Sequence, residues 1–381
     1  MGQEYKNIAI IGAGASGCIC TYYLLKQGFQ VTIFDYSSPL RTILPTGGGR
    51  CNLAYAEYDF RELAKNYPRG EKFLYSVFSR FSTSDTISLF EDLGIKTYVQ
   101  NDGRIFPESN SSKEVREKIL NKIKSAKMIK ENVLDVIPLD KEFEIKTSKA
   151  EYLFTDVVIA TGGNRVGTYF SSIGHNIIQP KPSLIGLNSD IKNLSGVVLN
   201  DVYSKDINET GNILFTHFGI SGPLVYKISS IKAREDFPYT LTFDLCPNLG
   251  NLQLTLDKNS HKLMKNILSE YFPHRFSEFI SSDTAEKKGF EINGKERDLI
   301  EEKIHNFNVT ITGTNKGEET VTSGGYDLNQ INPKTMESKL HDNIYIIGEA
   351  LDIDGFCGGF NLQNAWSTAF VAANGIINKK G

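Results

Sequence analysis

The first 35 residues contain a glycine pattern that limits how this chain can fold. Residues 8–11, Ile-Ala-Ile-Ile, form a short apolar run typical of a strand buried on both faces. The run leads into Gly12-Ala13-Gly14-Ala15-Ser16-Gly17, and a helical stretch then extends to about residue 27. A second strand follows over residues 31–34 and ends in Asp35. The order of strand, glycine turn, helix, strand and acid predicts a βαβ unit that binds a dinucleotide.

Each position of this pattern has a physical role. Gly12 permits the tight turn, Gly14 lets the backbone approach a pyrophosphate, and Gly17 allows the helix to pack closely on the strand. The pyrophosphate would lie at the helix N-terminus, which begins with Ala15 and Ser16. The carboxylate of Asp35 would accept hydrogen bonds from ribose hydroxyls. Because an acid at this position disfavours a 2′-phosphate, FAD or NAD is expected in this cleft rather than NADP.

A second glycine-rich segment favours FAD over NAD. A nicotinamide dehydrogenase normally continues with further βα units after its second strand, whereas this chain continues into Gly47-Gly48-Gly49-Arg50-Cys51-Asn52. Three consecutive glycines expose backbone N–H groups that can form an anion-binding nest, with Arg50 beside it. We therefore expect residues 48–52 to contact the cofactor. A flexible linker is the alternative interpretation.

Distinct motifs also occur in the rest of the chain. They are Gly103-Arg104-Ile105-Phe106-Pro107, Phe215-Thr216-His217-Phe218-Gly219-Ile220-Ser221-Gly222-Pro223, Val321-Thr322-Ser323-Gly324-Gly325, Thr335-Met336-Glu337-Ser338-Lys339 and residues 348–363. Together with residues 12–17 and 47–52, this set resembles a bacterial flavoprotein family of NAD(P)/FAD-dependent oxidoreductases, with BaiN-like and aminoacetone-oxidase-like members. The resemblance covers essentially the whole chain. It implies an α/β fold with a discontinuous Rossmann-like FAD-binding domain of the two-dinucleotide-binding type, an inserted β-rich domain and a small helical subdomain.

The resemblance also implies further contacts with FAD. Thr161 and Gly162 follow a strand that returns the chain to the cofactor sheet, and Val133 would lie near the adenine unless it is a plain sheet residue. After a buried strand, Gly348 and Glu349 would reach the ribityl chain, with Asp352 as a rival acid. The last helix would begin near Gly359, Asn361 and Leu362, where the glycines let backbone reach the isoalloxazine edge. The dipole of that helix can stabilise negative charge at the N1–C2=O locus of reduced flavin.

The chain changes in character near Pro180-Lys181-Pro182, because prolines resist regular strand pairing. We predict an FAD-binding domain over residues 1–182 and 321–381, a β-rich domain over 183–250 and 307–320, and a helical subdomain over 251–306. Helices are expected over residues 73–93, 262–271, 294–305 and 364–374, and one strand over residues 152–160.

Two side chains are candidates for catalysis. His217 could donate a proton to a substrate, or it could be a hydrogen-bonded structural histidine. Arg104 could bind an anionic substrate group, and a surface ion pair is an equal alternative. The five cysteines form no CxxC pair, and Cys51 and Cys357 are expected to be packing residues. No cluster of His and Cys suggests a metal site.

These patterns predict an FAD-dependent oxidoreductase that passes a hydride through flavin N5 between a donor and a small organic substrate, bound between the FAD domain and the insert. NADH or NADPH could be a transient donor. One alternative is an oxidase of amines or aminoketones that uses oxygen, and another is a flavin-binding accessory protein of RNA modification.

Charge and hydropathy narrow the expected partners. With 42 Lys and Arg against 45 Asp and Glu, the chain has no basic excess, so no nucleic-acid partner is expected. No run approaches 18 apolar residues, so no membrane span is expected. Residues 1–6 lack a signal-peptide profile, which suggests a cytoplasmic protein. The sequence leaves the oligomeric state open.

Overall fold

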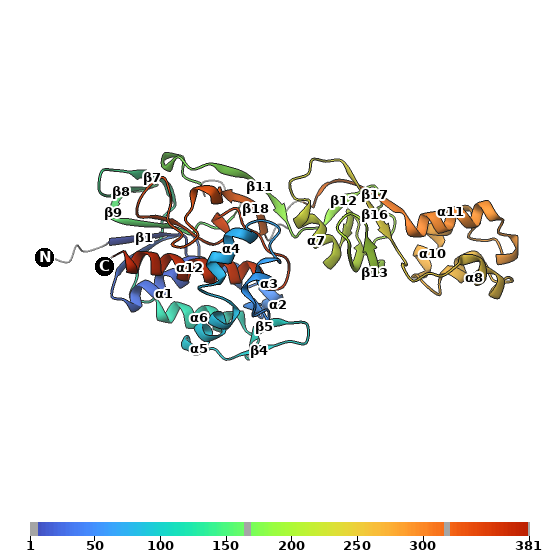
Figure 1. The fold of residues 1–381 in the computed structure, drawn as a ribbon, viewed down its shortest axis with the longest axis horizontal. Coiled ribbons are helices and arrows are strands. Elements are labelled where there is room, and N and C mark those ends of the chain that lie inside the picture. The colour runs from blue at the N-terminus through green and yellow to red at the C-terminus, as the bar shows by residue number, and fades with distance from the viewer. Residues whose placement is uncertain (1–6, 164–168, 316–320, 380–381) are drawn as a thin grey trace. The chain divides into compact units, whose positions relative to one another are not determined.

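The computed structural model describes residues 7–163, 169–315 and 321–379. The N-terminal residues 1–6, on which the cytoplasmic prediction depends, lie outside the described part. The chain forms two compact units (Figure 1). The first comprises Met1–Lys181 and Val321–Gly381, and the second comprises Pro182–Thr320, which includes the helices of residues 251–306.

A five-stranded parallel sheet forms the centre of the first unit. Its strand order is β19-β10-β1-β2-β6. The strands are β1 (Asn7–Ile11), β2 (Gln30–Phe34), β6 (Lys127–Ile129), β10 (Asp156–Ile159) and β19 (Ile344–Ile346). Ile10 pairs with Ile33 on one side and with Val158 on the other, so β1 lies in the middle of the sheet. Ile8, Ala9 and Ile10 are fully buried, as the continuous apolar run predicted.

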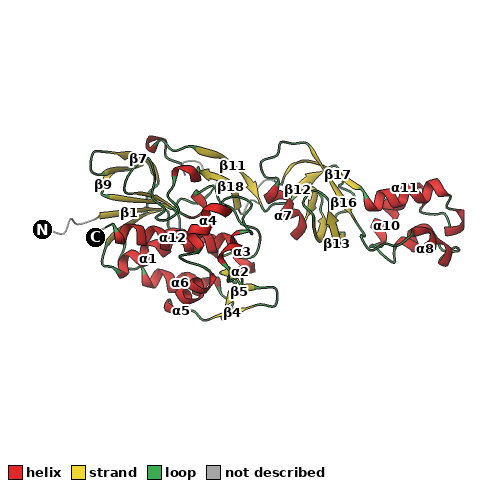
Figure 2. Ribbon diagram, viewed as in Figure 1, coloured by secondary structure: helices red, strands yellow, loops and turns green. Residues whose placement is uncertain are grey.

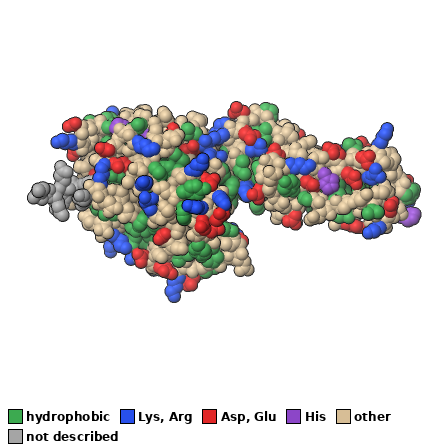
Figure 3. Space-filling view, viewed as in Figure 1, with side chains coloured by type: hydrophobic (Ala, Val, Ile, Leu, Met, Phe, Trp, Pro, Cys, Tyr) green, Lys and Arg blue, Asp and Glu red, His purple; other side chains and the backbone are tan. Residues whose placement is uncertain are grey.

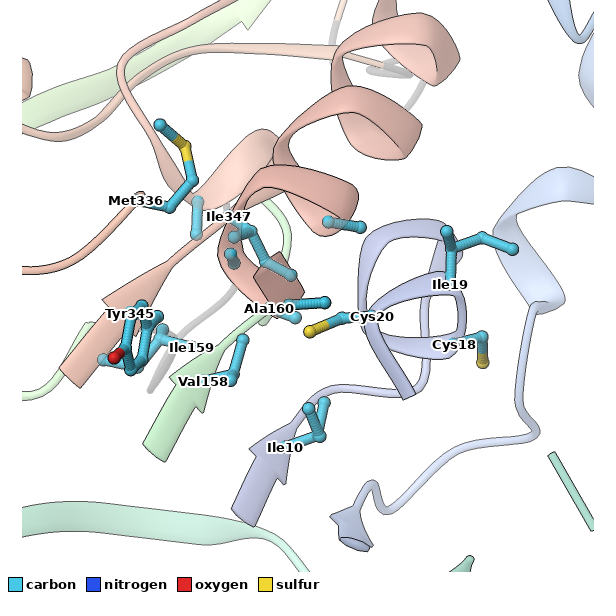
Figure 4. Close-up of a cluster of buried hydrophobic side chains, with 14 of the residues drawn as sticks. Ile10, Cys18, Ile19, Cys20, Val158, Ile159, Ala160, Met336, Tyr345 and Ile347 are labelled. Atoms are coloured by element: carbon cyan, nitrogen blue, oxygen red, sulfur yellow. The ribbon is translucent and has the colours of Figure 1, made fainter. Parts of the chain in front are cut away.

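Helices α1 (Ala15–Lys26) and α12 (Phe360–Asn378) pack against each other beside this sheet (Figure 1). Small side chains let them approach. Figure 4 shows Cys20 of α1 pointing toward Ala160, just past the end of β10, with Ile10 and Val158 nearby. Cys18 and Cys20 are fully buried, and burial raises the pKa of both thiols. Both cysteines are therefore core residues.

Smaller sheets surround the parallel sheet in the first unit. They are β3-β5-β4, formed by Ala54–Tyr55, Arg104–Pro107 and Thr97–Val99; β7-β8-β9, formed by Val133–Pro138, Phe143–Thr147 and Glu151–Phe154; and β11-β18, formed by Ile177–Ser183 and Val321–Tyr326. The remaining helices of this unit are α2 (Thr46–Gly49), α3 (Phe60–Ala64), α4 (Glu71–Phe78), α5 (Thr83–Asp92) and α6 (Ser112–Lys122). Short 3₁₀ turns cover Arg41–Ile43, Ser171–Ile173, Leu328–Gln330 and Gly348–Ala350.

Several predicted element bounds in this unit were wrong. The helix expected over residues 73–93 is two helices, α4 and α5, because Ser82 and Asp85 form a capping box that starts a new helix. The strand expected over residues 152–160 is split at Thr155 between β9, in an antiparallel meander, and β10, in the parallel sheet. The last helix begins at Phe360, earlier than expected.

The second unit is a closed β-barrel with helices inserted between its last strands in the chain, which Figure 2 shows as yellow strands and red helices. The barrel order is β12-β15-β14-β13-β16-β17, formed by Leu187–Ser189, Gly219–Ser221, Glu209–Phe215, Val198–Ser204, Tyr239–Asp244 and Phe307–Thr314. Its helices are α7 (Pro223–Ile231), α8 (Leu252–Lys258), α9 (Met264–Leu268), α10 (His274–Ser281) and α11 (Gly294–His305), with 3₁₀ turns at Ser282–Thr284 and Gly289–Glu291. The predicted helix 294–305 matches α11, whereas α9 is shorter than the predicted 262–271.

The predicted α/β fold, with a Rossmann-type sheet and a β-rich insert, is confirmed. None of the described helices is long and apolar enough to cross a membrane. Within the described ranges, no group of three or more His, Cys, Asp or Glu side chains could hold a metal ion.

Candidate functional site

The turn after β1 contains two glycines that pack against backbone atoms and one that faces open space. A Cβ atom built on Gly12, whose φ is +107°, would lie 2.2 Å from the carbonyl oxygen of Ala160. A Cβ atom on Gly17 would lie 2.0 Å from the carbonyl oxygen of Gly12. A Cβ atom on Gly14 would meet nothing within 4 Å. The absence of a side chain at Gly12 and Gly17 therefore lets strand and helix pack closely, and Gly14 leaves space at the start of α1.

The N-terminus of α1 suits an anion. Gly14 is its N-cap and supplies no side-chain hydrogen bond, and the first turn contains no acid. The first backbone N–H groups of the helix, on Ala15, Ser16 and Gly17, thus receive no side-chain cap from Gly14. Because these groups and the helix dipole favour negative charge, the open space at Gly14 fits a phosphate group.

Asp35 is held in place by its own turn. Its Oδ2 atom accepts a hydrogen bond of 2.8 Å from the Ala13 N–H, and its Oδ1 atom accepts two of 2.7 Å from the N–H and hydroxyl of Ser37. An ionised carboxylate offers about four acceptor positions. Asp35 is partly exposed, so Oδ2 can still accept from a ligand hydroxyl beside the α1 N-terminus.

The glycine segment at residues 47–49 is folded more tightly than the sequence suggested. Gly47, Gly48 and Gly49 all have positive φ, between 58° and 86°. However, Gly49 donates its N–H to Pro45 (3.4 Å) and Cys51 donates its N–H to Thr46 (3.0 Å), so these two groups are not free to bind an anion. Some N–H groups of the expected anion-binding nest are therefore already used by hydrogen bonds within the segment. A Cβ on Gly48 would meet nothing within 4 Å, so this residue faces open space.

Arg50, Cys51 and Asn52 stabilise the conformation of the glycine segment at residues 47–49. The Arg50 guanidinium donates to the carbonyl of Gly47 (3.1 Å) and to Gln100 (3.1 Å), and its Cζ atom lies 4.0 Å from the centroid of the Phe106 ring. Cys51 is fully buried, and burial raises the pKa of its thiol to about 12. Asn52 is also buried, with its backbone N–H close to Gly47.

The segment after β19 lies next to the α1 N-terminus. A Cβ built on Gly348 would lie 2.5 Å from the Ser16 hydroxyl oxygen. Glu349 accepts a hydrogen bond of 2.9 Å from the Thr322 N–H through Oε1, and the same oxygen lies close to Gly163. The chain therefore places the predicted Gly348 and Glu349 beside residues 16 and 163. Asp352, the rival acid, donates its N–H to the carbonyl of Tyr326 (3.1 Å).

Gly359 joins two segments that are distant in the sequence. It has φ of +98°, and a Cβ built there would lie 2.7 Å from the backbone of Ala54, so only glycine fits. The indole N–H of Trp366 donates to the carbonyl of Leu53 (2.9 Å), which adds a second link between α12 and β3. Because Leu53 and Ala54 directly follow residues 47–52, these two contacts bring that segment close to the start of α12.

The Asn361 side chain forms hydrogen bonds with the backbone of the loop that precedes α12. Its Oδ1 atom accepts from the Gly355 N–H (2.9 Å), and its Nδ2 atom donates to the Gly355 carbonyl (2.8 Å). Because both ends of the amide are used, the Asn361 side chain braces the loop, and its backbone remains available at the N-terminus of α12. That N-terminus has neither a side-chain cap nor an acid in its first turn. Leu362 is half-buried in the same turn.

Of three further predicted positions, Val133 lies in a smaller sheet, whereas Thr161 and Gly162 lie beside the turn at Gly12. Val133 is buried at the start of β7, opposite Thr147. Thr161 and Gly162 follow β10 at its carboxyl end, and a Cβ on Gly162 would meet nothing within 4 Å. Ligands of open parallel sheets bind at this carboxyl edge.

The two candidate catalytic residues belong to different units. Arg104, at the start of β5 in the first unit, is half-buried and forms an ion pair with Asp102, in which Nε donates at 2.8 Å. His217 is exposed on the turn between β14 and β15 of the barrel, with its ring edge-on to Phe218 at 5.2 Å between centroids. Their catalytic roles stay predictions.

Sequence reasoning missed features of the loop before α12. Cys357, expected to be a packing residue, is exposed, whereas Cys51 is buried as expected. Asp354, in the same loop, is fully buried and paired with Arg69. The sequence contained no sign of Arg69, because the two partners are 285 positions apart.

We expect Cys357 to be the cysteine that reacts first with iodoacetamide in the native protein. It is exposed, while Cys246 is half-buried and Cys18, Cys20 and Cys51 are buried. Surrounding protein atoms raise the pKa of its thiol above the usual 9.0, and the nearby positive charge of Arg104 offsets this only in part. Since the thiolate is the reactive form, the labelling rate should keep rising with pH from pH 7 to pH 9.

Peptide mass spectrometry after timed alkylation would identify the labelled residue. The variant Cys357→Ser should lose the fast phase and keep the slow labelling of the other thiols. First labelling of any other cysteine, or a rate that levels off below pH 8, would contradict this prediction.

Comparison with known proteins decides the family. The model of the HI0933-like protein Rossmann domain matches residues 6–375. This chain belongs to the HI0933-like family. As an HI0933-like protein it is an FAD-dependent oxidoreductase, which confirms the resemblance noted in its motifs and the predicted cofactor FAD.

Similar HI0933-like proteins align over almost their full lengths. A ribosomal RNA dihydrouridine synthase of Haemophilus influenzae is 29% identical over 98% of this chain and 99% of its own. One of Escherichia coli is 28% identical over 99% and 100%. A 3-dehydro-bile acid delta(4,6)-reductase of Clostridium scindens is 28% identical over 98% and 100%.

A solved flavocytochrome c3 fumarate reductase, in its open conformation, shares the fold. Its TM-score is 0.53 at 13% identity, covering 98% of this chain and 78% of the other.

Proposed function

We propose that this protein is an FAD-dependent reductase that adds hydrogen across a carbon–carbon double bond conjugated to a carbonyl group, with electrons from NADH or NADPH. One observation carries the reaction class. The three relatives that align end to end are named for reductions of this kind, two forming dihydrouridine and one acting on a 3-oxo-Δ4,6 bile acid. In both substrates the double bond is polarised by a carbonyl, so its far carbon accepts a hydride.

The described residues fit FAD. The open space at Gly14 and the N–H groups of α1 would hold the pyrophosphate, and Asp35 would accept from the adenosine ribose. Gly348 and Glu349, which lie beside the α1 N-terminus, would take the ribityl chain. When bound, FAD supplies hydride transfer through its N5 atom.

The start of α12 is suited to the flavin ring. Gly358 and Gly359 carry no side chains, and the uncapped helix N-terminus that follows favours negative charge. Reduced flavin carries such charge at its N1–C2=O edge. The chain would in this way stabilise the reduced cofactor electrostatically, without an ionised side chain.

The names of the relatives suggest two substrate classes. We favour a small conjugated ketone, because the chain has no excess of basic residues and because, on the face drawn in Figure 3, Lys and Arg side chains are interspersed with Asp and Glu. A uracil base within RNA is the second candidate, which the names of two full-length relatives favour.

Anaerobic half-reactions would test this function. NADPH or NADH should bleach the bound flavin, and a 3-oxo-4,6-diene steroid or a uridine-containing RNA should then restore its colour without oxygen. Mass spectrometry should find a product heavier by two hydrogen atoms. The proposal fails if neither nicotinamide reduces the flavin while aminoacetone does, since that result would indicate an amine oxidase. Recovery of colour with RNA alone would select the second substrate class.

A further inference from the structure

A buried ion pair joins two segments of the first unit. Arg69 lies between α3 and α4, and Asp354 lies in the loop before α12. The Arg69 guanidinium donates through Nε to Asp354 Oδ1 and through Nη2 to Asp354 Oδ2, the latter at 2.6 Å. The Asp354 side chain is 0% exposed and that of Arg69 is 12% exposed. Such a two-point pair fixes the orientation of both side chains as well as their distance.

Residues around Arg69 hold the same loop at further points. The backbones of Arg69 and Asp354 form an antiparallel bridge, and the Phe356 N–H donates to the carbonyl of Asn66 (3.0 Å). The Tyr67 hydroxyl donates to the carbonyl of Phe360 (2.6 Å), in the first turn of α12. We call the segment of residues 66–70, together with its contacts to residues 353–360, the loop clamp.

Glycines make these contacts close. A Cβ built on Gly355 would lie 2.9 Å from the Tyr67 ring, and a Cβ on Gly70 would lie 2.7 Å from the Ile353 side chain. The Asn361 side chain also binds the backbone of Gly355. The loop from Asp354 to the first turn of α12 is thus held both by residues 66–70 and by Asn361.

We propose that Arg69 and Asp354 are positioning residues that place the N-terminus of α12 against the flavin, and that they thereby raise the reduction potential of the bound FAD. The inference rests on the FAD site proposed above. The field of a helix terminus decays within its first turn, so its effect on reduced flavin depends on where that turn lies. Neither residue need touch the cofactor.

The variants Arg69→Lys and Asp354→Asn test this proposal. Lysine keeps the positive charge of Arg69 but not its planar fork, so a folded protein that binds FAD is expected. The ratio of its affinities for reduced and oxidised FAD should fall about tenfold, which corresponds to a potential about 30 mV more negative. Asp354→Asn removes the carboxylate charge opposite a largely buried guanidinium and should lower thermal stability as well.

Spectroelectrochemical titration of the FAD-loaded proteins, without substrate, would give the potentials. The matched control is Glu62→Gln, which breaks the exposed pair of Lys65 and Glu62 on the neighbouring helix α3. Its potential should equal that of the wild type. An unchanged potential in Arg69→Lys would overturn the proposal even if its melting temperature fell, because that result indicates a purely structural pair.

The readout separates this inference from the proposed reaction. A wild-type protein that binds FAD but reduces no conjugated double bond would refute the proposed reaction. The comparison of reduction potentials would still decide the role of the loop clamp. A wild-type protein that binds no FAD would refute both.

Discussion

Replacing Gly14 with glutamate is expected to weaken FAD binding strongly while the protein without cofactor keeps its fold. A Cβ at Gly14 meets nothing within 4 Å, and the backbone there has φ −78° and ψ −167°, which any residue can adopt. The new carboxylate would occupy the space at the α1 N-terminus and repel a pyrophosphate. Two like charges about 4 Å apart repel by about 4 kcal/mol near a protein surface. We therefore expect the Kd for FAD to rise at least about 100-fold.

Titration of the protein with FAD would measure this loss, and thermal unfolding without FAD would test the fold. An acid near the N-terminus of a helix is favourable, so the melting temperature of the FAD-free protein should stay the same or rise slightly. Gly250→Glu is the matched control, since a Cβ at Gly250 also meets nothing within 4 Å. Normal FAD affinity in Gly14→Glu would show that the cofactor does not use this turn.

Replacing Gly17 with alanine should instead destabilise the whole first unit. Alanine favours a helix over glycine by about 1 kcal/mol, so helix propensity alone predicts a gain. The added Cβ would lie 2.0 Å from the Gly12 carbonyl oxygen, a backbone atom that cannot move without shifting β1 or α1. We expect a loss of about 3 kcal/mol or more in the free energy of unfolding, at the upper end of overpacking effects.

Denaturant unfolding of the FAD-free proteins would measure the difference, and Gly14→Ala provides the comparison with the same side chain three positions earlier. Gly14→Ala should cost no more than about 1 kcal/mol, because alanine is a poorer N-cap residue than glycine but its Cβ would meet no atom within 4 Å. A stabilised Gly17→Ala would mean that α1 does not pack on the turn as described.

Much of the cofactor domain could be predicted from short stretches of sequence. Residues 7–35 form the predicted strand, glycine turn, helix and strand, because each step depends on neighbours in the chain. The predicted bounds failed where tertiary pairing decided them. Residues 152–160 are uniformly strand-like, yet β9 and β10 join different sheets, and that choice depends on partners at residues 143–147 and 8–11.

The motifs predict where the candidate site lies, and the structure describes the contacts among its residues. The sequence placed glycines at 47–49 and at 358–359 near one cofactor, and the structure adds that Gly359 rests on Ala54. Asn361 is predicted to contact the cofactor, and its side-chain amide also binds the backbone of Gly355, so its contact with FAD stays a prediction. An asparagine makes either kind of hydrogen bond, so its residue type alone cannot distinguish them.

By itself, the sequence determined the dinucleotide turn, the acid that follows it and the family of the protein. These depend on backbone dihedrals and spacing, which glycine and its neighbours encode locally. Only the tertiary structure decided at which glycines a side chain would clash and which glycines face open space. It alone paired Arg69 with Asp354. Both outcomes depend on contacts between distant segments, such as Ser16 with Gly348 and Arg69 with Asp354, whose geometry is set by the packed core and not by any local pattern.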